Sequence, residues 1–111
     1  MTDITDEFMR EMLGQSKTYT MVILRPGANY GGDNDATIWE HGRRNFALRA
    51  EGKLAIVVPI TDDTDACGLG IFDAGADEVT GLMDSDPGVQ AGVFTYEVHP
   101  FRGFPGDTLP A

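Results

Sequence analysis

The sequence is poor in cysteine, in positive charge and in long apolar runs. Its single cysteine, Cys67, cannot form an intramolecular disulfide and leaves no cysteine-rich zinc site. Eight Lys and Arg residues stand against 18 Asp and Glu, and the formal net charge of −10 disfavours nucleic-acid and anionic-membrane partners. No run approaches the roughly 18 apolar residues of a membrane-spanning helix. The acidic start of the chain lacks the features of a signal peptide, so we expect a cytoplasmic protein.

The chain is otherwise short and has the composition of an ordinary globular protein. The 111 residues are 41% hydrophobic and 23% charged, which suits one domain with one core. No repeat, low-complexity block or linker divides the chain. We therefore expect a single domain over residues 1–111, with a leading helix at about 3–14, a core at about 18–102 and a tail at 103–111.

The apolar pattern predicts four strands and two helices within that core. Strands are indicated by alternation or by short apolar runs, and helices by apolar residues three or four positions apart. The predicted strands are residues 17–24, 53–60, 66–72 and 92–100, and the predicted helices are residues 36–51 and 76–83. The order β-α-β-β-α-β predicts an α+β, ferredoxin-like fold in which two helices cover one face of a four-stranded antiparallel sheet.

Several predicted strands carry apolar residues on both faces. The helices cover one face of the sheet, and the other face then needs a partner. A symmetric homodimer that stacks sheet on sheet would bury it. The short leading helix is marginal by itself, and we expect it to dock on the body or on a second subunit.

The predicted helix at residues 36–51 holds the more informative of the two histidines. Ile38, Trp39, Gly42 and Phe46 fall in one broad sector at helical spacing, which we interpret as the side that faces the core. His41 lies at the edge of that sector and is expected to face inward beside the core.

His41 and Asp86 form the one plausible acid–base pair of the sequence. Imidazole gains and loses a proton near neutral pH, and a carboxylate can fix its tautomer and stabilise the imidazolium. Structural interpretations stand beside this one. A single histidine on a helix is more often a satisfied, partly buried side chain, and an aspartate before proline often caps a turn. Asp84 is an alternative partner for the imidazole.

Six segments resemble the YCII-related proteins, a group of dimeric α/β barrels with ferredoxin-like folds. The resemblance covers roughly residues 18–102, and its most specific part is the stretch from Asp86-Pro87 through Ala91-Gly92-Val93. The segments are residues 22–27, Glu40-His41, residues 51–54, Pro59 before Asp62-Asp63, residues 68–73 and residues 86–94. The family pattern has a helix histidine and an aspartate in an Asp-Pro turn as the suspected catalytic pair, which fall here on His41 and Asp86.

The resemblance implies chemistry on small ring compounds, since related proteins act on chlorinated hydroquinones and others are similar in fold to muconolactone isomerases. We therefore expect a small enzyme in which His41 and Asp86 isomerise a cyclic or enolisable small molecule or eliminate water or hydrogen halide from it. Arg25, Tyr30 and Trp39 are candidates to bind the substrate. The alternative is a non-catalytic module on the same dimer scaffold that binds a small molecule or a partner, with His41 and Asp86 in structural roles.

The other reactive residue types receive structural interpretations. His99 ends the last predicted strand, and we assign it a structural or dimer-contact role. Cys67 has no neighbouring base in the sequence and is interpreted as a small buried hydrophobic residue. Two isolated histidines do not make a metal site, and no cofactor-binding motif is present, so we expect neither metal nor cofactor.

Overall fold

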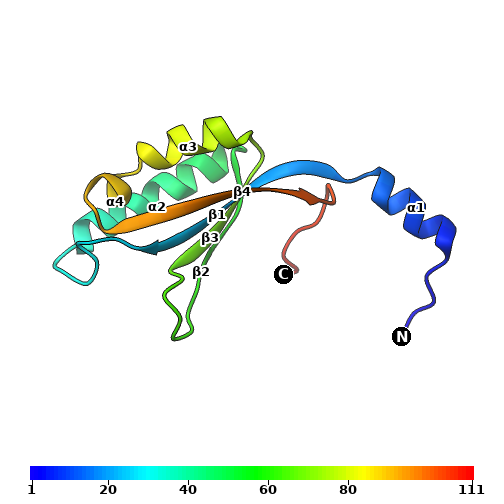
Figure 1. The fold of residues 1–111 in the computed structure, drawn as a ribbon, viewed down its shortest axis with the longest axis horizontal. Helices are drawn as coiled ribbons and strands as arrows, with labels where there is room; N and C mark the ends of the chain where they lie inside the picture. The colour runs from blue at the N-terminus through cyan, green and yellow to red at the C-terminus, as the bar shows by residue number, and fades with distance from the viewer.

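A four-stranded antiparallel sheet with helices on one face forms the body of the protein (Figure 1). The computed structural model describes all of residues 1–111. Its elements are α1 (Asp6–Gly14), β1 (Lys17–Pro26), α2 (Asp35–Ala50), β2 (Leu54–Pro59), β3 (Gly68–Phe72), α3 (Ala76–Asp84), α4 (Pro87–Gln90) and β4 (Phe94–Gly103). The predicted α+β, ferredoxin-like order after a leading helix is confirmed.

The sheet has the order β2-β3-β1-β4, so the first strand lies at its centre. β1 pairs with β4 along its whole length, from Lys17 opposite Gly103 to Pro26 opposite Phe94. β2 is an edge strand, with a register shift near its start, and this position tolerates Pro59 because no neighbour needs its missing N–H.

The core lies between the sheet and helices α2, α3 and α4. Alternate residues of β1, namely Thr20, Val22 and Leu24, are buried beneath these helices. Val79 and Met83 of α3, one turn apart, pack onto the same core. Full burial of such a side chain contributes about 1.5–3 kcal/mol, so these contacts hold α3 against the sheet.

The opposite face of the sheet carries no helix (Figure 1). The register brings apolar residues of β1 beside those of β3 and β4 on this face. The pairs are Ile23 with Leu69, Met21 with Ile71, and Tyr19 with Phe101. An apolar row therefore crosses the uncovered face, as the sequence predicted.

Two strands run further than the sequence indicated. Arg25 and Pro26 continue β1 instead of ending it, because Phe94 and Thr95 of β4 pair with them. β4 likewise continues to Gly103, since Lys17–Tyr19 supply its partner and the Tyr19 and Phe101 rings stack with centroids 5.8 Å apart. The short helix α4 was not predicted, because its four residues read as a turn.

The inward side of α2 agrees with its apolar sector except at Trp39, because Ile38 and Phe46 line the space between the helix and the sheet. Ile38, Trp39 and Phe46 are exposed, Trp39 to 69%, whereas Leu48 is buried. The residues that face the body include His41, which bonds Asp86 beneath the helix. The prediction that Trp39 faces the core was wrong, because its side chain turns outward and is exposed.

Helix α1 lies outside the body and projects from the end of β1 (Figure 1). Thr5 caps it by accepting a hydrogen bond from the backbone N–H of Phe8, at 3.1 Å. The helix has no buried residue. None of the helices has the length and apolar character that a membrane crossing requires.

Candidate active site

His41 and Asp86 lie in direct contact although 45 residues separate them. The Nδ1 atom of His41 is 2.8 Å from Oδ2 and 2.9 Å from Oδ1 of the carboxylate. Only 13% of the His41 side chain and 1% of the Asp86 side chain are exposed. The imidazole also packs on Phe94, with ring centroids 4.9 Å apart. The pair is therefore a buried, close contact that tertiary packing fixes on two sides.

The start of α4 holds the Asp86 carboxylate in place. Asp86 is the N-cap of this helix, and its Oδ2 accepts hydrogen bonds from the backbone N–H groups of Gly88 and Val89 at 3.0 and 3.2 Å. Pro87 at the first helical position fixes the backbone for this geometry. The same carboxylate thus caps a turn and bonds the imidazole, so both interpretations of Asp86 describe contacts that exist.

The surroundings of Asp86 favour its ionised form. Burial alone would raise the pKa of this carboxyl, but hydrogen bonding and charge from His41, the Val89 amide and the nearby Arg44 guanidinium together lower the pKa below its ordinary value. Arg44 lies one helical turn from His41, with Nη1 3.7 Å from Oδ1 of Asp86. Asp86 is consequently a carboxylate at neutral pH, and it accepts a hydrogen bond from the Nδ1–H group of His41.

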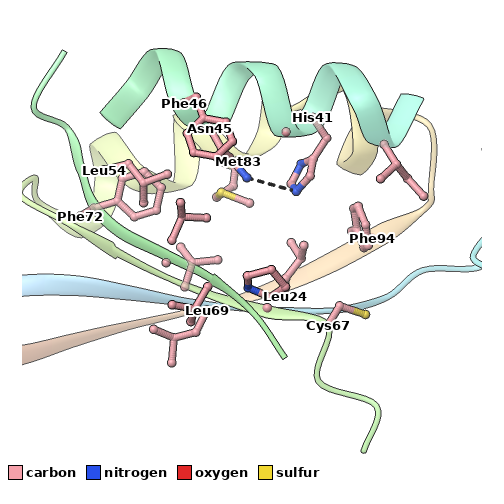
Figure 2. Close-up of a pocket in the computed structure, with 18 residues that line it drawn as sticks. Leu24, His41, Asn45, Phe46, Leu54, Cys67, Leu69, Phe72, Met83 and Phe94 are labelled. Carbon is pink, nitrogen blue, oxygen red and sulfur yellow. Dashed lines mark hydrogen bonds between the residues drawn. The ribbon is translucent and has the colours of Figure 1, made fainter. Parts of the chain in front are cut away.

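The opposite nitrogen of His41 faces the side chain of Asn45. The Nδ2 atom of Asn45 lies 3.3 Å from Nε2 of His41 (Figure 2). With Nδ1 carrying the proton toward Asp86, Nε2 offers its lone pair and Asn45 donates to it, a tautomer assigned from the hydrogen-bond network. Both residues lie on the inner side of α2, so the helix presents a basic nitrogen and an amide together.

A cavity of about 350 Å³ opens beside this pair, between α2 and the sheet (Figure 2). Its walls are mostly apolar and include Leu24, Leu54, Phe72, Met83 and Phe94. The polar side chains among the lining residues are His41, Asn45 and Cys67. Such a cavity suits a small ring with few polar groups, and its size lies within the usual range for small-molecule sites.

Two of the predicted binding residues lie away from this cavity. Arg25 lies in β1 on the uncovered face of the sheet, and its guanidinium is already paired with Glu97 at 2.5 Å and with Asp65 at 2.8 Å. Trp39 points outward from α2 and lines a separate surface groove. The structure therefore does not bring Arg25 and Trp39 together with His41 and Asp86.

Tyr30 does not line the cavity but lies beside one of the residues that do. Its ring lies 6.1 Å from that of Phe94, which also contacts His41. Charge interaction and side-chain hydrogen bonding with the neighbouring Cys67 raise the pKa of the Tyr30 hydroxyl. Cys67 was expected to be buried, but it is partly exposed and lines the cavity.

Asp84 and His99 are engaged elsewhere. Asp84 accepts a hydrogen bond from the Tyr96 hydroxyl, so it is not the partner of His41. His99 is exposed and lies 3.0 Å from Glu97, its neighbour two residues away on β4. No group of three or more His, Cys, Asp and Glu side chains is arranged to hold a metal ion.

Three residues of this site were not predicted from the sequence. Arg44 and Asn45 follow His41 by three and four positions, and helical spacing could have assigned them to the same side of α2. Phe94 gave no such signal. Its place against His41 depends on β4 passing beneath α2, which only the folded chain determines.

Comparison with known proteins finds a solved structure of similar fold. No protein-family model matches the chain, and no curated protein matches it. The fold is similar to that of 5-chloro-2-hydroxyhydroquinone dehydrochlorinase (TftG) from Burkholderia phenoliruptrix AC1100, solved in complex with 2,5-dihydroxybenzoquinone. The two are 26% identical with a TM-score of 0.50, over 72% of this chain and 90% of that one. This likeness supports the ferredoxin-like fold.

Proposed function

We propose that this chain is a small enzyme that uses His41 as general acid and base, oriented by Asp86, on a small cyclic or enolisable compound. The observation that carries the proposal is the buried 2.8 Å contact between His41 and Asp86 at the wall of an apolar cavity. Proton transfers of this kind need no cofactor, and positioned acid–base groups typically give about a hundred- to ten-thousand-fold acceleration.

Each polar group has a distinct task in this proposal. Asp86 keeps the proton of His41 on Nδ1 and stabilises the imidazolium that forms when Nε2 takes a proton. Asn45, 3.3 Å from Nε2, exchanges its contact with the imidazole for one with an oxygen of the bound ring. The apolar walls exclude water, which strengthens both interactions.

Elimination of hydrogen chloride from a chlorinated hydroquinone is the reaction that we favour, since a structural neighbour is named for acting on such a compound. His41 Nε2 takes a hydroxyl proton and returns it to the ring carbon that bears chlorine, giving the keto tautomer. Nε2 then takes a second hydroxyl proton while chloride leaves that carbon with the bonding electron pair. The ring ends as a quinone, and no external oxidant is required because the carbon that loses chloride is reduced.

We further propose that the chain is a YCII-related protein, folded as one domain and active as a homodimer through the uncovered sheet face. Two features support this: the six sequence segments that resemble the YCII-related proteins, and the apolar row formed by Tyr19, Met21, Ile23 and their partners. Stacking two such faces removes apolar surface from water at about 25 cal/mol per Å². We also propose that the substrate is a chlorinated hydroquinone and that the protein is cytoplasmic.

Two assays test the proposal. The first measures chloride release from 5-chloro-2-hydroxyhydroquinone in the absence of oxygen, and the second follows the absorbance of a panel of unsaturated lactones. We expect saturable turnover of at least one compound. Binding of the chlorine-free hydroxyhydroquinone without turnover of any compound in either set would contradict the enzyme and support the non-catalytic binding module instead.

A further inference from the structure

Strand β3 carries large side chains on one face of the sheet and almost none on the other. Leu69 and Ile71 point to the uncovered face, whereas the inward positions beneath the helices are Gly68, Gly70 and Phe72. Glycine inside a strand weakens it, and it often marks a place where a ligand or another backbone approaches closely. Two successive inward positions of β3 therefore contribute only backbone to the interior.

The neighbouring strands keep their side chains beside both glycines. The pairs are Leu24 and Pro59 on the two sides of Gly68, and Val22 and Val57 on the two sides of Gly70. Residues that lie opposite each other on adjacent strands point to the same face of the sheet. A furrow therefore runs along the inner face of β3, with the glycine backbone as its floor and side chains of β1 and β2 as its walls.

This glycine furrow is the floor of the cavity beside His41, because both glycines and all four wall residues line that cavity. Leu54 and Phe72 lie at one end of the cavity, and Cys67 lies toward the other (Figure 2). An added Cβ at Gly70 would be 3.2 Å from Leu54 and 3.3 Å from the Phe72 ring. These two side chains therefore already occupy the space over Gly70.

The space over Gly68 is not filled in this way. Apart from its chain neighbours, a Cβ added there would meet only the carbonyl oxygen of Val58, at 3.1 Å, and no side chain within 4 Å. Gly68 is nevertheless a buried position of β3, so this space belongs to the interior of the fold. The unfilled part of the glycine furrow is thus the part over Gly68.

The unfilled part of the furrow lies next to the candidate acid–base group. The imidazole of His41 packs on Phe94, which pairs with Pro26 of β1. Gly68 pairs with Leu24, the residue of β1 that precedes Pro26 on the same face. Because residues two apart on a strand are separated by about 7 Å, a six-membered ring over Gly68 can bring one edge to the imidazole.

We propose that Gly68 determines substrate specificity, because the furrow over it holds a planar six-membered ring whose hydroxyl-bearing edge faces His41. The walls stand two strand spacings apart, about 10 Å between backbones, and their side chains project into that width. A flat ring can enter such a narrow furrow edge-on, whereas a puckered, saturated ring is thicker. The inference rests on the proposed function and narrows its substrate to planar ring compounds.

Phenol and cyclohexanol test this inference, because they have the same heavy atoms and differ in planarity. Titration calorimetry measures their dissociation constants for the wild type, for Gly68→Ala and for Gly81→Ala, the matched control in α3 where an added Cβ meets nothing within 4 Å. We expect the wild type to bind phenol more tightly than cyclohexanol. Gly68→Ala should weaken phenol binding about ten- to two-hundred-fold, the usual effect of one methylene-sized group in an apolar pocket. Gly81→Ala should keep the wild-type value.

A second measurement uses the wild-type protein and decides the matter even where Gly68→Ala does not fold. A ¹H–¹⁵N correlation spectrum recorded during titration with phenol follows every backbone amide, and the ring current shifts the amides nearest to the bound ring. We expect a large shift for the amide of Gly68 and none for that of Gly81.

Four results would overturn the inference: no binding of phenol to the wild type, cyclohexanol binding as tight as that of phenol, phenol binding that Gly68→Ala leaves unchanged, or an amide shift at Gly68 no larger than at Gly81. Phenol carries no leaving group, so these results are independent of chloride release. The expected binding without turnover of any compound would contradict the proposed reaction alone. Turnover together with an unaffected Gly68→Ala would contradict this inference alone.

Discussion

The chain contains two histidines, and each contacts a carboxylate at nearly the same distance. His41 lies 2.8 Å from Asp86, and His99 lies 3.0 Å from Glu97. The surroundings differ completely. The first pair is 13% and 1% exposed, whereas the second is 54% and 42% exposed and lies two residues apart on one strand. Distance alone therefore does not distinguish a candidate site from a surface ion pair.

What distinguishes the pairs is how many other groups hold them. Asp86 accepts from two backbone amides, and Phe94 packs on the ring of His41, so the geometry persists without solvent. Glu97 is shared between His99 and Arg25, and hydrogen bonds from both lower its pKa in an exposed position. Exposed pairs of this kind are screened by water and salt and contribute little to stability.

The largest difference between the pairs should appear in turnover. His41→Gln removes the group that exchanges protons with the substrate, and we expect the rate of chloride release to fall about a hundred- to ten-thousand-fold. His99→Gln, the matched control, should keep the wild-type rate. Equal rates for His41→Gln and the wild type, with an unchanged circular dichroism spectrum, would refute the catalytic role of His41.

The carboxylates should differ in their contribution to folding. Asp86→Ala leaves the amides of Gly88 and Val89 and the Nδ1 of His41 without their buried acceptor, and we expect it to lower the free energy of unfolding by about 1–3 kcal/mol. Glu97→Ala should shift the urea midpoint much less, because water replaces the lost contacts. Urea unfolding at neutral pH measures both, and a larger effect at Glu97 would reverse our ranking of the two pairs.

The glycine that follows Asp86 offers a steric test of the buried pair. A Cβ on Gly88 would lie 2.7 Å from the Phe94 ring and 3.1 Å from the Asp86 carboxylate. Gly88→Ala should therefore displace Phe94 and cost about 1–3 kcal/mol. Gly81→Ala in α3 meets nothing within 4 Å and should stabilise by about 0.5–1 kcal/mol. Thermal unfolding of both variants compares them, and a stabilised Gly88→Ala would show that the site is loosely packed.

The smallest expected effect is in the response to acid. The pKa of Asp86 and that of Glu97 are both lower in the folded protein than in the unfolded chain, so the unfolded state binds protons first as the pH falls. Both contributions are complete above about pH 4.5 and are lost as the pH drops toward the folded values. Salt should weaken the stabilisation that is lost in Glu97→Gln, and it should leave the stabilisation that is lost in Asp86→Asn unchanged. Urea unfolding between about pH 3 and pH 6 at low and high salt separates them, and equal salt sensitivity would contradict the difference in burial.

Strand pattern and helical spacing sufficed for the order of elements, and the resemblance to YCII-related proteins selected His41 and Asp86. The outward position of Trp39 could not be predicted, because this side chain is more apolar than His41 and yet is 69% exposed. The contact of His41 with Asp86 could not be derived from helical spacing either, because it depends on Asp86 lying beneath the helix.

The position of Arg25 away from the cavity has a physical cause. Arg25 was placed by its position at the end of β1, but strand alternation turns it to the face opposite Leu24, where Glu97 and Asp65 pair with it. The sequence does show that neighbouring side chains of β1 alternate between the two faces of the sheet. The sequence does not show which face of the sheet the helices cover, because that depends on the side to which the crossover connections turn.

The most direct test of the central idea is a long-range ¹H–¹⁵N spectrum of both histidine rings at about pH 9, where imidazoles are neutral, with and without phenol as a simple ring probe. We expect His41 to carry its proton on Nδ1, toward Asp86, and phenol to shift its Nε2 resonance while His99 stays unchanged. A proton on Nε2 of His41, or a phenol response no larger than that of His99, would contradict an oriented acid–base pair that opens on a ring-binding cavity.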